Sequence, residues 1–200
     1  MLSDLLQPYN LLLASASPRR QMLLSDLDLN FSVPSLIDVD EVYPGTLHKS
    51  EVAEYLAQKK AQAYLPSLSA NDILITADTV VVCDDTVMGK PSTLDEAKEM
   101  LALLSGREHD VITGVSLVNK KLTRVFSVDT KVFFRKLTSS EINYYVEKYR
   151  PLDKAGAYGI QEWIGYVGVS SIEGSYFNVM GLPVQRLYCE LEKFVQSINQ

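Results

Sequence analysis

Apolar residues along the chain fall into short continuous runs and into helical spacings that follow one another in turn. An apolar run predicts a buried strand over 10–14. A helix over 18–28 comes next, with Ser17 as its N-cap and Pro18 as its first residue. Apolar positions from 49 to 63 recur at helical spacing and predict a further helix.

The same patterns continue to the C-terminus, with caps and turn residues marking the boundaries. The further predicted elements are a strand over 72–77 that continues or resumes over 80–83, a turn at Asp84-Asp85, a helix opened by a Thr93/Glu96 capping box and stopped at Gly106, strands over 110–118 and 124–135 joined by a turn at 119–121, a helix over 139–149 opened by a Thr138/Glu141 capping box, and a last helix from Pro183. Strands alternate with helices, and antiparallel hairpins are mixed in. We therefore predict a single α/β domain over residues 1–200 with a mixed sheet.

Composition places the chain among ordinary globular proteins. The 200 residues are 46% hydrophobic and 22% charged, and no apolar run approaches the ~20 residues needed to cross a bilayer. The first ten residues include Asp4 but no Lys or Arg, so they do not resemble a secretory signal. We expect a cytoplasmic protein with no membrane association.

Charge and cysteine content narrow the function further. The net charge of −6 at pH 7 argues against broad nucleic-acid binding, which requires a basic surface, but is compatible with a small phosphate ligand in a local basic pocket. Cys83 lies in a predicted strand and Cys189 in a predicted helix, so both are expected to be buried thiols rather than a disulfide. His48 and His109, the only histidines, lack zinc-ligand spacing.

The segment from Ser15 to Arg20 has the composition of an anion-binding site. A strand that leads into a helix N-terminus directs backbone N–H groups and the positive end of the helix dipole at one point. Two arginines, Arg19 and Arg20, and the hydroxyls of Ser15 and Ser17 at the same turn favour a phosphate ligand. The alternative is a surface arginine pair beside an ordinary helix cap.

A second candidate is Asp78, which interrupts an otherwise apolar strand. A buried carboxylate must be paired, protonated or bound to a cation, and α/β proteins bind ligands where strand ends open on a cleft. Asp78 is therefore a candidate general base or metal ligand, with a structural carboxylate that caps a turn as the alternative. Thr79 either presents its hydroxyl to the same cleft or favours the strand through its β-branch.

Other charged residues match the needs of a phosphorylated substrate. Asp38, Asp40 and Glu41 form an acidic loop that can hold a divalent cation, although a solvated acidic turn is the more frequent meaning of such a run. Lys60 lies on the predicted buried face of its helix, and Lys90 lies in a narrow Gly-Lys-Pro turn. With the arginine pair these lysines can neutralise a polyphosphate, but the sequence does not show that they converge.

The segment 151–161 combines small residues with polar ones. Its glycines and alanines permit close backbone approach, while Asp153, Lys154 and Gln161 supply polar groups. The Gln161 amide offers both donors and an acceptor, so it can pair with the edge of a nucleobase. The histidine at 109, shortly after Ser105-Gly106, is interpreted as a turn residue beyond a helix end.

Six motifs together resemble the Maf family of nucleoside triphosphate pyrophosphatases, in order and in spacing. They are Ser15-Ala16-Ser17-Pro18-Arg19-Arg20, Lys60-Ala61, Ala77-Asp78-Thr79, Lys90-Pro91, Ser105-Gly106 with His109, and the segment from Leu152 to Gln161. The resemblance covers nearly the whole chain, and the last segment is the most specific to the family. Thr76 departs from the glycine that the family often has before Ala-Asp-Thr, which we expect to alter strand packing more than chemistry.

The resemblance implies a fold similar to that of inosine triphosphate pyrophosphatases, a mixed twisted sheet with flanking helices in two lobes around a nucleotide cleft. It implies hydrolysis of a nucleoside triphosphate to the monophosphate and pyrophosphate, with Mg²⁺ or Mn²⁺ as cofactor. Arg19, Thr79 and Gln161 match the positions associated with substrate choice in the branch that acts on dTTP and UTP.

The roles expected for individual residues follow from this resemblance. Asp78 matches the proton acceptor, and it shares the metal with a carboxylate of the acidic loop, assigned to Glu41 with Asp40 as the alternative. Phosphate binding is assigned to Ser15, Ser17, Arg20, Lys60 and Lys90, with Asp153 and Lys154 as secondary polar groups.

Two other functions stay as alternatives. One is a nucleotide-binding regulator of septum formation and cell division with little catalysis, which the family's historical name suggests. The other is a phosphatase that releases orthophosphate, although the chain has neither a phosphatase nucleophile motif nor a P-loop. A role in cleansing the nucleotide pool of normal or modified pyrimidine nucleotides fits the enzyme. The oligomeric state stays open, with a homodimer among the options.

Overall fold

In the computed structural model, which describes residues 1–199 and every side chain among them except that of Ser50, six strands form one mixed sheet. The strands are β1 (Asn10–Leu13), β2 (Asp72–Cys83), β3 (Thr86–Met88), β4 (Glu108–Val118), β5 (Thr123–Phe134) and β6 (Val169–Glu173). Their order is β1-β2-β4-β5-β6, with β3 paired to β2. β1 runs parallel to β2, whereas the β2–β3 and β5–β6 pairs are antiparallel. The predicted α/β class with a mixed sheet is confirmed.

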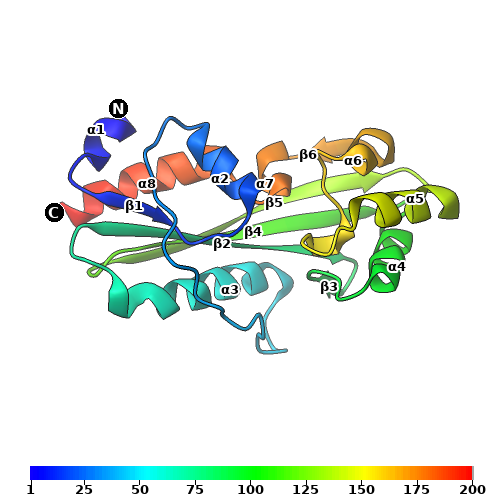
Figure 1. The fold of residues 1–200 in the computed structure, drawn as a ribbon, viewed down its shortest axis with the longest axis horizontal. Coiled ribbons are helices and arrows are strands. Elements are labelled where there is room, and N and C mark those ends of the chain that lie inside the picture. The colour runs from blue at the N-terminus through cyan, green and yellow to red at the C-terminus, as the bar shows by residue number, and fades with distance from the viewer. Residues whose placement is uncertain (200) are drawn as a thin grey trace. The chain divides into compact units, whose positions relative to one another are not determined.

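Helices precede, connect and follow these strands (Figure 1). They are α1 (Leu2–Leu6), α2 (Pro18–Ser25), α3 (Lys49–Tyr64), α4 (Leu94–Leu104), α5 (Ser139–Tyr149), α6 (Trp163–Gly168), α7 (Tyr176–Met180) and α8 (Val184–Ile198), with short 3₁₀ turns η1 (Leu65–Ser67) and η2 (Ala155–Ala157). The predicted N-caps are confirmed: the hydroxyls of Ser17, Thr93 and Thr138 each accept a hydrogen bond from the backbone three residues on. The Thr138/Glu141 capping box is complete, whereas the Glu96 carboxylate accepts from the Ser92 amide and not from that of Thr93.

Several details differ from the sequence-based expectation. α2 ends at Ser25 rather than at 28, because the amides of Leu27 and Asp28 donate to carbonyls three residues back instead of four. Asp28 then leaves the helical conformation, with φ of 55°. α1, α6, β6 and α7 were not predicted, since elements of five or six residues are too short to show a periodicity. Cys83 is buried, but the expectation that Cys189 is also buried is wrong. It lies two residues from Leu187, on a different side of α8 from the buried stripe.

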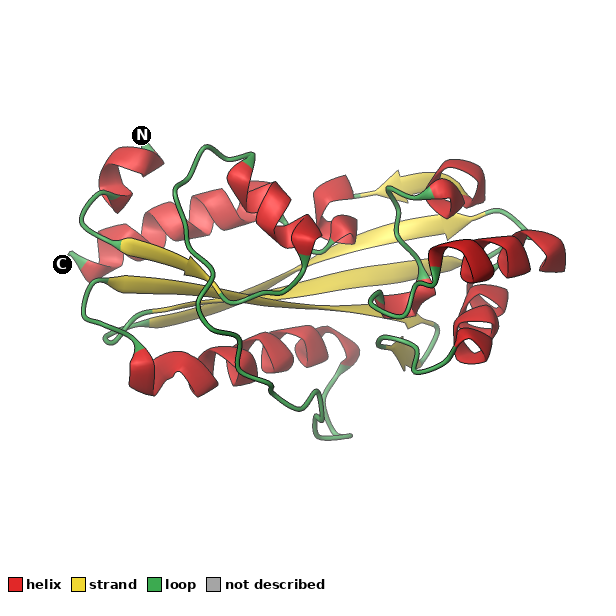
Figure 2. Cartoon of the chain, viewed as in Figure 1, coloured by secondary structure: helices red, strands yellow, loops and turns green. Residues whose placement is uncertain are grey.

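The described chain divides into two compact units, each built from several segments. The first comprises Met1–Asp78, Thr113–Val128 and Gly181–Gln200, and the second comprises Thr79–Ile112 and Asp129–Met180. In the first unit α3 covers one side of the strands and α8 the other (Figure 2). In the second unit α4 packs against α5 and against the η2 turn.

α3 lies close to the sheet of the first unit because two strand residues accommodate it. Gly114 on β4 has no side chain, and a Cβ there would lie 2.5 Å from the Glu54 amide nitrogen. On β2, the buried Thr76 hydroxyl donates a hydrogen bond of 2.7 Å to the Ala57 carbonyl. Thr76 thus acts on packing between helix and strand, as the sequence suggested.

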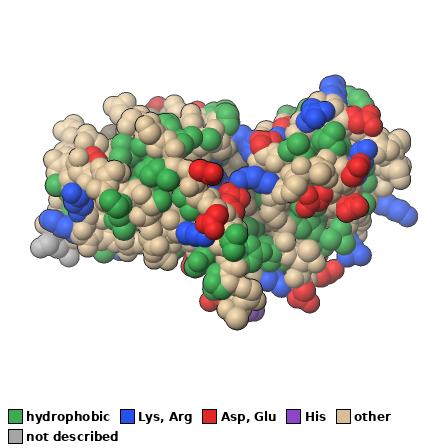
Figure 3. Space-filling view, turned by 60° about the horizontal axis from the view of Figure 1, so that its bottom comes forward, with side chains coloured by type: hydrophobic (Ala, Val, Ile, Leu, Met, Phe, Trp, Pro, Cys, Tyr) green, Lys and Arg blue, Asp and Glu red, His purple; other side chains and the backbone are tan. Residues whose placement is uncertain are grey.

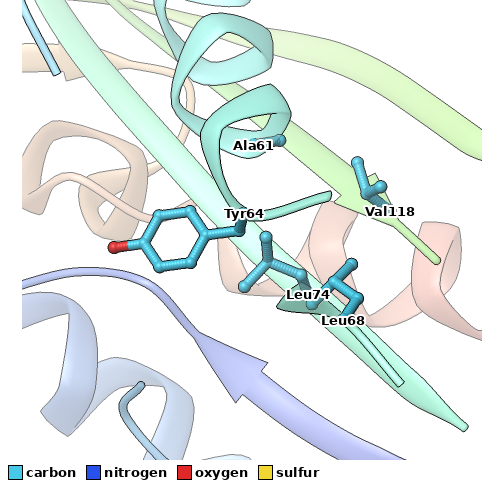
Figure 4. Close-up of a cluster of buried hydrophobic side chains, with 5 residues drawn as sticks. All are labelled: Ala61, Tyr64, Leu68, Leu74 and Val118. Atoms are coloured by element: carbon cyan, nitrogen blue, oxygen red, sulfur yellow. The ribbon is translucent and has the colours of Figure 1, made fainter. Parts of the chain in front are cut away.

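The C-terminal part of α3 ends in a buried apolar cluster. Figure 4 shows Ala61, Tyr64, Leu68, Leu74 and Val118, which lie on α3, the segment after it, β2 and β4. The ring of Tyr64 packs at the margin of this cluster while its hydroxyl points away from it (Figure 4). The hydroxyl accepts a hydrogen bond of 2.9 Å from the Ile37 amide. The core of this unit therefore also fixes the start of the acidic loop.

Candidate active site

The turn between β1 and α2 lies at the end of β1, beside the middle of the longer parallel strand β2. The Ala14 amide donates to the Ile75 carbonyl at 3.0 Å, so β1 ends beside β2 shortly before Asp78. Ser17 Oγ accepts from the Arg20 amide at 3.5 Å and thereby caps α2. Ser15 Oγ accepts from the Ser17 amide at 3.3 Å. The carboxyl end of a strand that leads into a helix is a place where α/β sheets bind ligands, and here only β1 ends.

Arg20 ties this turn to the neighbouring backbone. Its Nε donates to the Gly181 carbonyl at 2.7 Å and its Nη1 to the Ala77 carbonyl at 2.8 Å. Burial lowers the pKa of the Arg20 guanidinium and Arg19 adds to this, while the negative charges of Asp78 and Glu41 oppose it. The predicted phosphate-binding arginine is therefore held next to the predicted catalytic carboxylate.

Asp78 and Glu41 share one ammonium group. Asp78 is buried, with 5% of its surface exposed, and its Oδ1 accepts a hydrogen bond from Lys60 Nζ. The same Nζ donates to Glu41 Oε1 at 2.9 Å. The ion pair offsets the cost of burying a carboxylate. The structure thus brings together, in the first unit, a strand residue, a helix residue and a loop residue that the sequence analysis had selected separately.

The acidic loop, residues 35–45, is attached to α3 rather than solvated on all sides. Lys59 Nζ lies 2.5 Å from Asp40 Oδ1 and donates to the Val42 carbonyl at 3.0 Å. The sequence showed no partner for this loop because its lysines come from a helix further along the chain. Asp40 and Glu41 point to different lysines, and Glu41 is the one whose lysine also contacts Asp78.

Two carboxylates around one cation are a donor set that suits a hard divalent ion. Mg²⁺ is usually bound through one or two carboxylates together with substrate phosphates, not by an all-protein cage. Among residues 1–199, no three His, Cys, Asp or Glu side chains lie together as a metal cluster. Glu41 and Asp78 therefore fit a metal that a phosphorylated ligand helps to hold.

In the second unit, the predicted lysine turn lies beside the small-residue segment. The Gly156 amide donates to the Gly89 carbonyl at 3.1 Å, next to Lys90. Gly156 has φ of 64°, and a Cβ there would lie 2.8 Å from Val81 Cγ2 on β2. Only glycine suits this position, because the backbone is left-handed and the Val81 side chain leaves no space for a Cβ.

Lys154 lies inside an ion-pair network. It is buried, and its Nζ lies 2.7 Å from Asp153 Oδ1 and 3.1 Å from Glu162 Oε1. The other oxygen of Glu162 accepts from the hydroxyl of Tyr145, which in turn accepts from the Gly159 amide at 3.0 Å. Sequence analysis missed Glu162 and Tyr145, since the first lies beyond the motif and the second has the pattern of a helix core residue.

Gln161 lies within the turn that this network surrounds. The Glu162 amide donates to the Gly159 carbonyl at 2.9 Å and closes the turn. Gln161 Oε1 is buried, and no residue of the described chain donates a hydrogen bond to it. A buried acceptor without a donor is costly, so a donor on a ligand would stabilise this side chain.

His109 is not the turn residue that the sequence suggested. It lies on β4 with 2% of its surface exposed, because β4 begins at Glu108, earlier than predicted. Its Nε2 is 2.8 Å from the Tyr158 hydroxyl, and its ring packs edge-to-face against Phe134 and Tyr158. His109 thus anchors the residue that follows η2.

The stability of the protein should depend on pH through His109. Burial lowers the pKa of His109 to about 4 from an ordinary 6.5, so between these values the unfolded chain binds more protons. The contribution of the neutral, buried His109 to stability is therefore fully present above pH 6.5, and it is lost as the pH falls towards 4. We expect the free energy of unfolding to fall by about 2 kcal/mol between pH 7 and pH 5 from this residue alone.

Urea denaturation at a series of pH values measures this loss. His109→Phe should flatten the dependence, whereas His48→Gln, at the other histidine of the chain, should leave it unchanged. Equal pH slopes in His109→Phe and the wild type would contradict the prediction.

The selected residues separate into two sets, one in each unit. Ser15, Ser17, Arg19, Arg20, Glu41, Lys60 and Asp78 belong to the first unit, and Thr79, Lys90, Asp153, Lys154 and Gln161 to the second. Asp78 and Thr79 are consecutive residues of β2 and belong to one unit each. The contacts of Asp78 and Arg20 described above all lie within the first unit. They give no information about the residues of the second set.

Lys and Arg side chains are interspersed with Asp and Glu on the face in Figure 3, which shows no broad basic surface. No helix within residues 1–199 combines the length and the apolar character needed to span a membrane.

The chain was compared with protein-family models, with the sequences of known proteins and with solved structures. The Maf-like protein family model matches residues 10–194. The chain is 53% identical to a dTTP/UTP pyrophosphatase of Parabacteroides distasonis, over 94% of this chain and 98% of the relative. It is 50% identical to the protein of that name from Porphyromonas gingivalis, over 97% and 98%. A solved HAM1 protein from Coxiella burnetii is 18% identical, with a TM-score of 0.49 over 92% of this chain and 99% of that one.

Proposed function

The chain belongs to the Maf-like protein family, and on this premise we propose that it hydrolyses dTTP and UTP to the nucleoside monophosphate and pyrophosphate. The relatives named above carry the name dTTP/UTP pyrophosphatase and align over almost their whole length. The observation that carries the proposal is the Lys60 ammonium shared by Asp78 and Glu41. A buried carboxylate, a second carboxylate and adjacent cations are the groups that phosphoanhydride hydrolysis needs.

Asp78 is the general base of this mechanism. It accepts a proton from a water molecule whose oxygen forms a bond to the α-phosphorus. The bond between that phosphorus and the oxygen that bridges to the β-phosphorus breaks, and its electron pair leaves with pyrophosphate. The Lys60 contact supports this role because it fixes one carboxylate oxygen of Asp78.

The cationic residues of the first unit bind the phosphates. Arg19, Arg20 and Lys60 supply three positive charges against the two negative charges of Asp78 and Glu41. Backbone N–H groups at the start of α2 add further donors, because Ser17 begins the helix at this turn. Lys90 of the second unit is proposed as a further phosphate ligand.

Glu41 and Asp78 are proposed to hold a divalent cation, Mg²⁺ or Mn²⁺. Such an ion, when bound, neutralises charge on the phosphate oxygens as the anhydride bond breaks. Glu41 is favoured over Asp40 for this role because Asp40 pairs with Lys59, away from Asp78.

Gln161 is proposed to recognise the base, with Arg19 and Thr79 contributing to substrate choice. Uracil and thymine present an N3–H donor between two carbonyl acceptors, which complements the acceptor and donors of one amide. The Gln161 oxygen, which lacks a donor among the described residues, supports a partner of this kind. The remaining polar groups of this segment, Asp153 and Lys154, are proposed to act through the turn, since Lys154 contacts Glu162.

Gln161→Glu should lower kcat/KM for UTP and dTTP by about tenfold or more. It should lower kcat/KM for GTP and ATP much less. The change removes the amide donors and adds a negative charge while it keeps the size of the side chain. Steady-state kinetics on the four nucleotides measure the effect. Gln185→Glu, an exposed position on α8, is the matched control. An unchanged ratio of UTP to GTP activity in Gln161→Glu would remove Gln161 from base recognition.

The products decide between this reaction and its alternatives. Purified protein is incubated with Mg²⁺ or Mn²⁺ and a panel of nucleoside triphosphates, and the phosphate products are separated by anion exchange. We expect monophosphate and pyrophosphate from UTP and dTTP. Orthophosphate with a nucleoside diphosphate would indicate a phosphatase, and tight binding without turnover would indicate a regulator.

A further inference from the structure

Tyr145 on α5 has no part in the reaction described above, yet its hydroxyl contacts both ends of the turn that carries Gln161. It accepts a hydrogen bond of 3.0 Å from the Gly159 amide and donates one to the Glu162 carboxylate. The turn is closed by the bond from the Glu162 amide to the Gly159 carbonyl. One oxygen atom therefore joins the residue two positions before Gln161 to the residue directly after it.

The surroundings leave the Tyr145 hydroxyl little freedom. Its side chain is fully buried, and its ring stacks on Tyr149 with centroids 5.0 Å apart. Burial raises the pKa of Tyr145, and the hydrogen bond to the Glu162 carboxylate adds to this, so the hydroxyl keeps its proton and remains a donor.

The turn is also held from two other sides. Lys154 Nζ lies 3.1 Å from the second oxygen of Glu162, so both carboxylate oxygens are engaged. A Cβ at Gly159 would lie 2.9 Å from Glu162 Cδ, and one at Gly165 would overlap the Ile160 carbonyl oxygen. The backbone on either side of Gln161 is therefore closely packed and held by the contacts of Glu162.

We propose that Tyr145 is a positioning residue for base recognition, which fixes the Gly159–Glu162 turn so that Gln161 meets a uracil or thymine base in one orientation. The inference rests on the proposed role of Gln161. Tyr145 is not among the residues proposed to touch the reacting groups. Its loss should thus weaken nucleotide binding and selectivity without slowing the chemical step, because a base contact made equally in ground and transition states acts on KM.

Tyr145→Phe tests this, since it removes the hydroxyl and keeps the ring. We expect the KM for UTP to rise about tenfold, with kcat within about twofold of the wild type, and the KM for GTP to change much less. Tyr149→Phe, on the same helix and stacked on the same ring, is the matched control and should retain the wild-type KM. A residue that only stabilises the core would lower Tm in Tyr145→Phe and leave the UTP to GTP selectivity intact, and that result overturns the proposal.

A pair of substitutions at Glu162 keeps the test independent of Tyr145. Glu162→Ala removes the acceptor for the Tyr145 hydroxyl and should raise the KM for UTP as Tyr145→Phe does. Glu162→Gln keeps an acceptor and should restore most of the affinity. The double variant Tyr145→Phe/Glu162→Ala should be no worse than either single one, because both act through the same turn. Two results would argue against the positioning role of Tyr145. One is an equal rise in the KM for UTP in Glu162→Ala and Glu162→Gln, and the other is a double variant whose rise is the full product of the two single rises.

Binding measured without turnover separates this proposal from the proposed function. Trp163, the only tryptophan of the chain, lies two residues after Gln161, so its fluorescence can report UTP binding in the presence of EDTA. If the wild type binds UTP but does not hydrolyse it when Mg²⁺ is supplied, the proposed function fails. The Kd of Tyr145→Phe for UTP still tests whether Tyr145 is a positioning residue. A tenfold weaker Kd supports it, and an unchanged Kd overturns it. A wild type that neither binds UTP in EDTA nor hydrolyses it with Mg²⁺ overturns both.

Discussion

Asp78→Asn should lower kcat for UTP hydrolysis by on the order of 10²-fold or more while leaving nucleotide affinity within a few-fold of the wild type. The amide cannot take up a proton from water at neutral pH, so the proposed general base is lost. The change is nearly isosteric, and Lys60 keeps Glu41 as a charged partner at 2.9 Å, so the surrounding ion pairs need not collapse. The effect should therefore fall on the chemical step.

Single-turnover kinetics with UTP and Mg²⁺, together with the Kd measured through Trp163 in EDTA, separate the two quantities. Asp95→Asn, which alters an exposed carboxylate at the start of α4, is the matched control and should retain wild-type turnover. Turnover near the wild-type value in Asp78→Asn would remove Asp78 from the base role. A folded variant that has lost UTP affinity instead would make Asp78 a binding residue.

Gly114→Ala should destabilise the protein by about 3 kcal/mol, although it adds only one methyl group. That methyl would lie 2.5 Å from the Glu54 amide nitrogen and closer still to the Ala53 carbonyl group, which are backbone atoms of α3. A side chain can rotate away from such a clash, but a helix backbone must move as a body. Lys60 lies on the same helix, so the shift should also disturb its contact with Asp78.

Thermal unfolding measures the loss, and for a chain of this size we expect Tm to fall by about 6–12 °C. Gly45→Ala is the matched control. No atom lies within 4 Å of a Cβ at Gly45, and its backbone is not left-handed, so its Tm should stay within about 1 °C of the wild type. A Tm for Gly114→Ala equal to that of Gly45→Ala would show that α3 can move away from β4 without cost.

Several features of the site could be predicted because they depend on neighbours in the chain. Ser17 caps α2 by bonding to an amide three residues on, and the Thr138 cap works in the same way. Asp78 stands out because a carboxylate within an apolar strand needs a partner wherever the strand lies. The role of Gln161 was likewise predicted from the composition of its segment and the family resemblance, and it stays a prediction.

Other features could not be predicted because they join residues far apart in the chain. The acidic loop appeared to have no partner, yet Lys59 and Lys60 of α3 bind Asp40 and Glu41 about twenty residues away. His109 was interpreted as a turn residue, whereas packing against Phe134 and Tyr158 buries it.

The sequence by itself determined the α/β class and the main helix starts, and it selected the candidate site residues, which stay a prediction; these follow from local hydrogen bonding and from the cost of burying charge. Only the tertiary structure decided that Lys60 serves both Asp78 and Glu41, and that Tyr145 holds the turn of Gln161. The physical reason is that a hydrogen bond depends on distance and direction between two groups. For groups separated by many residues, these are set by how helices pack on the sheet and on one another.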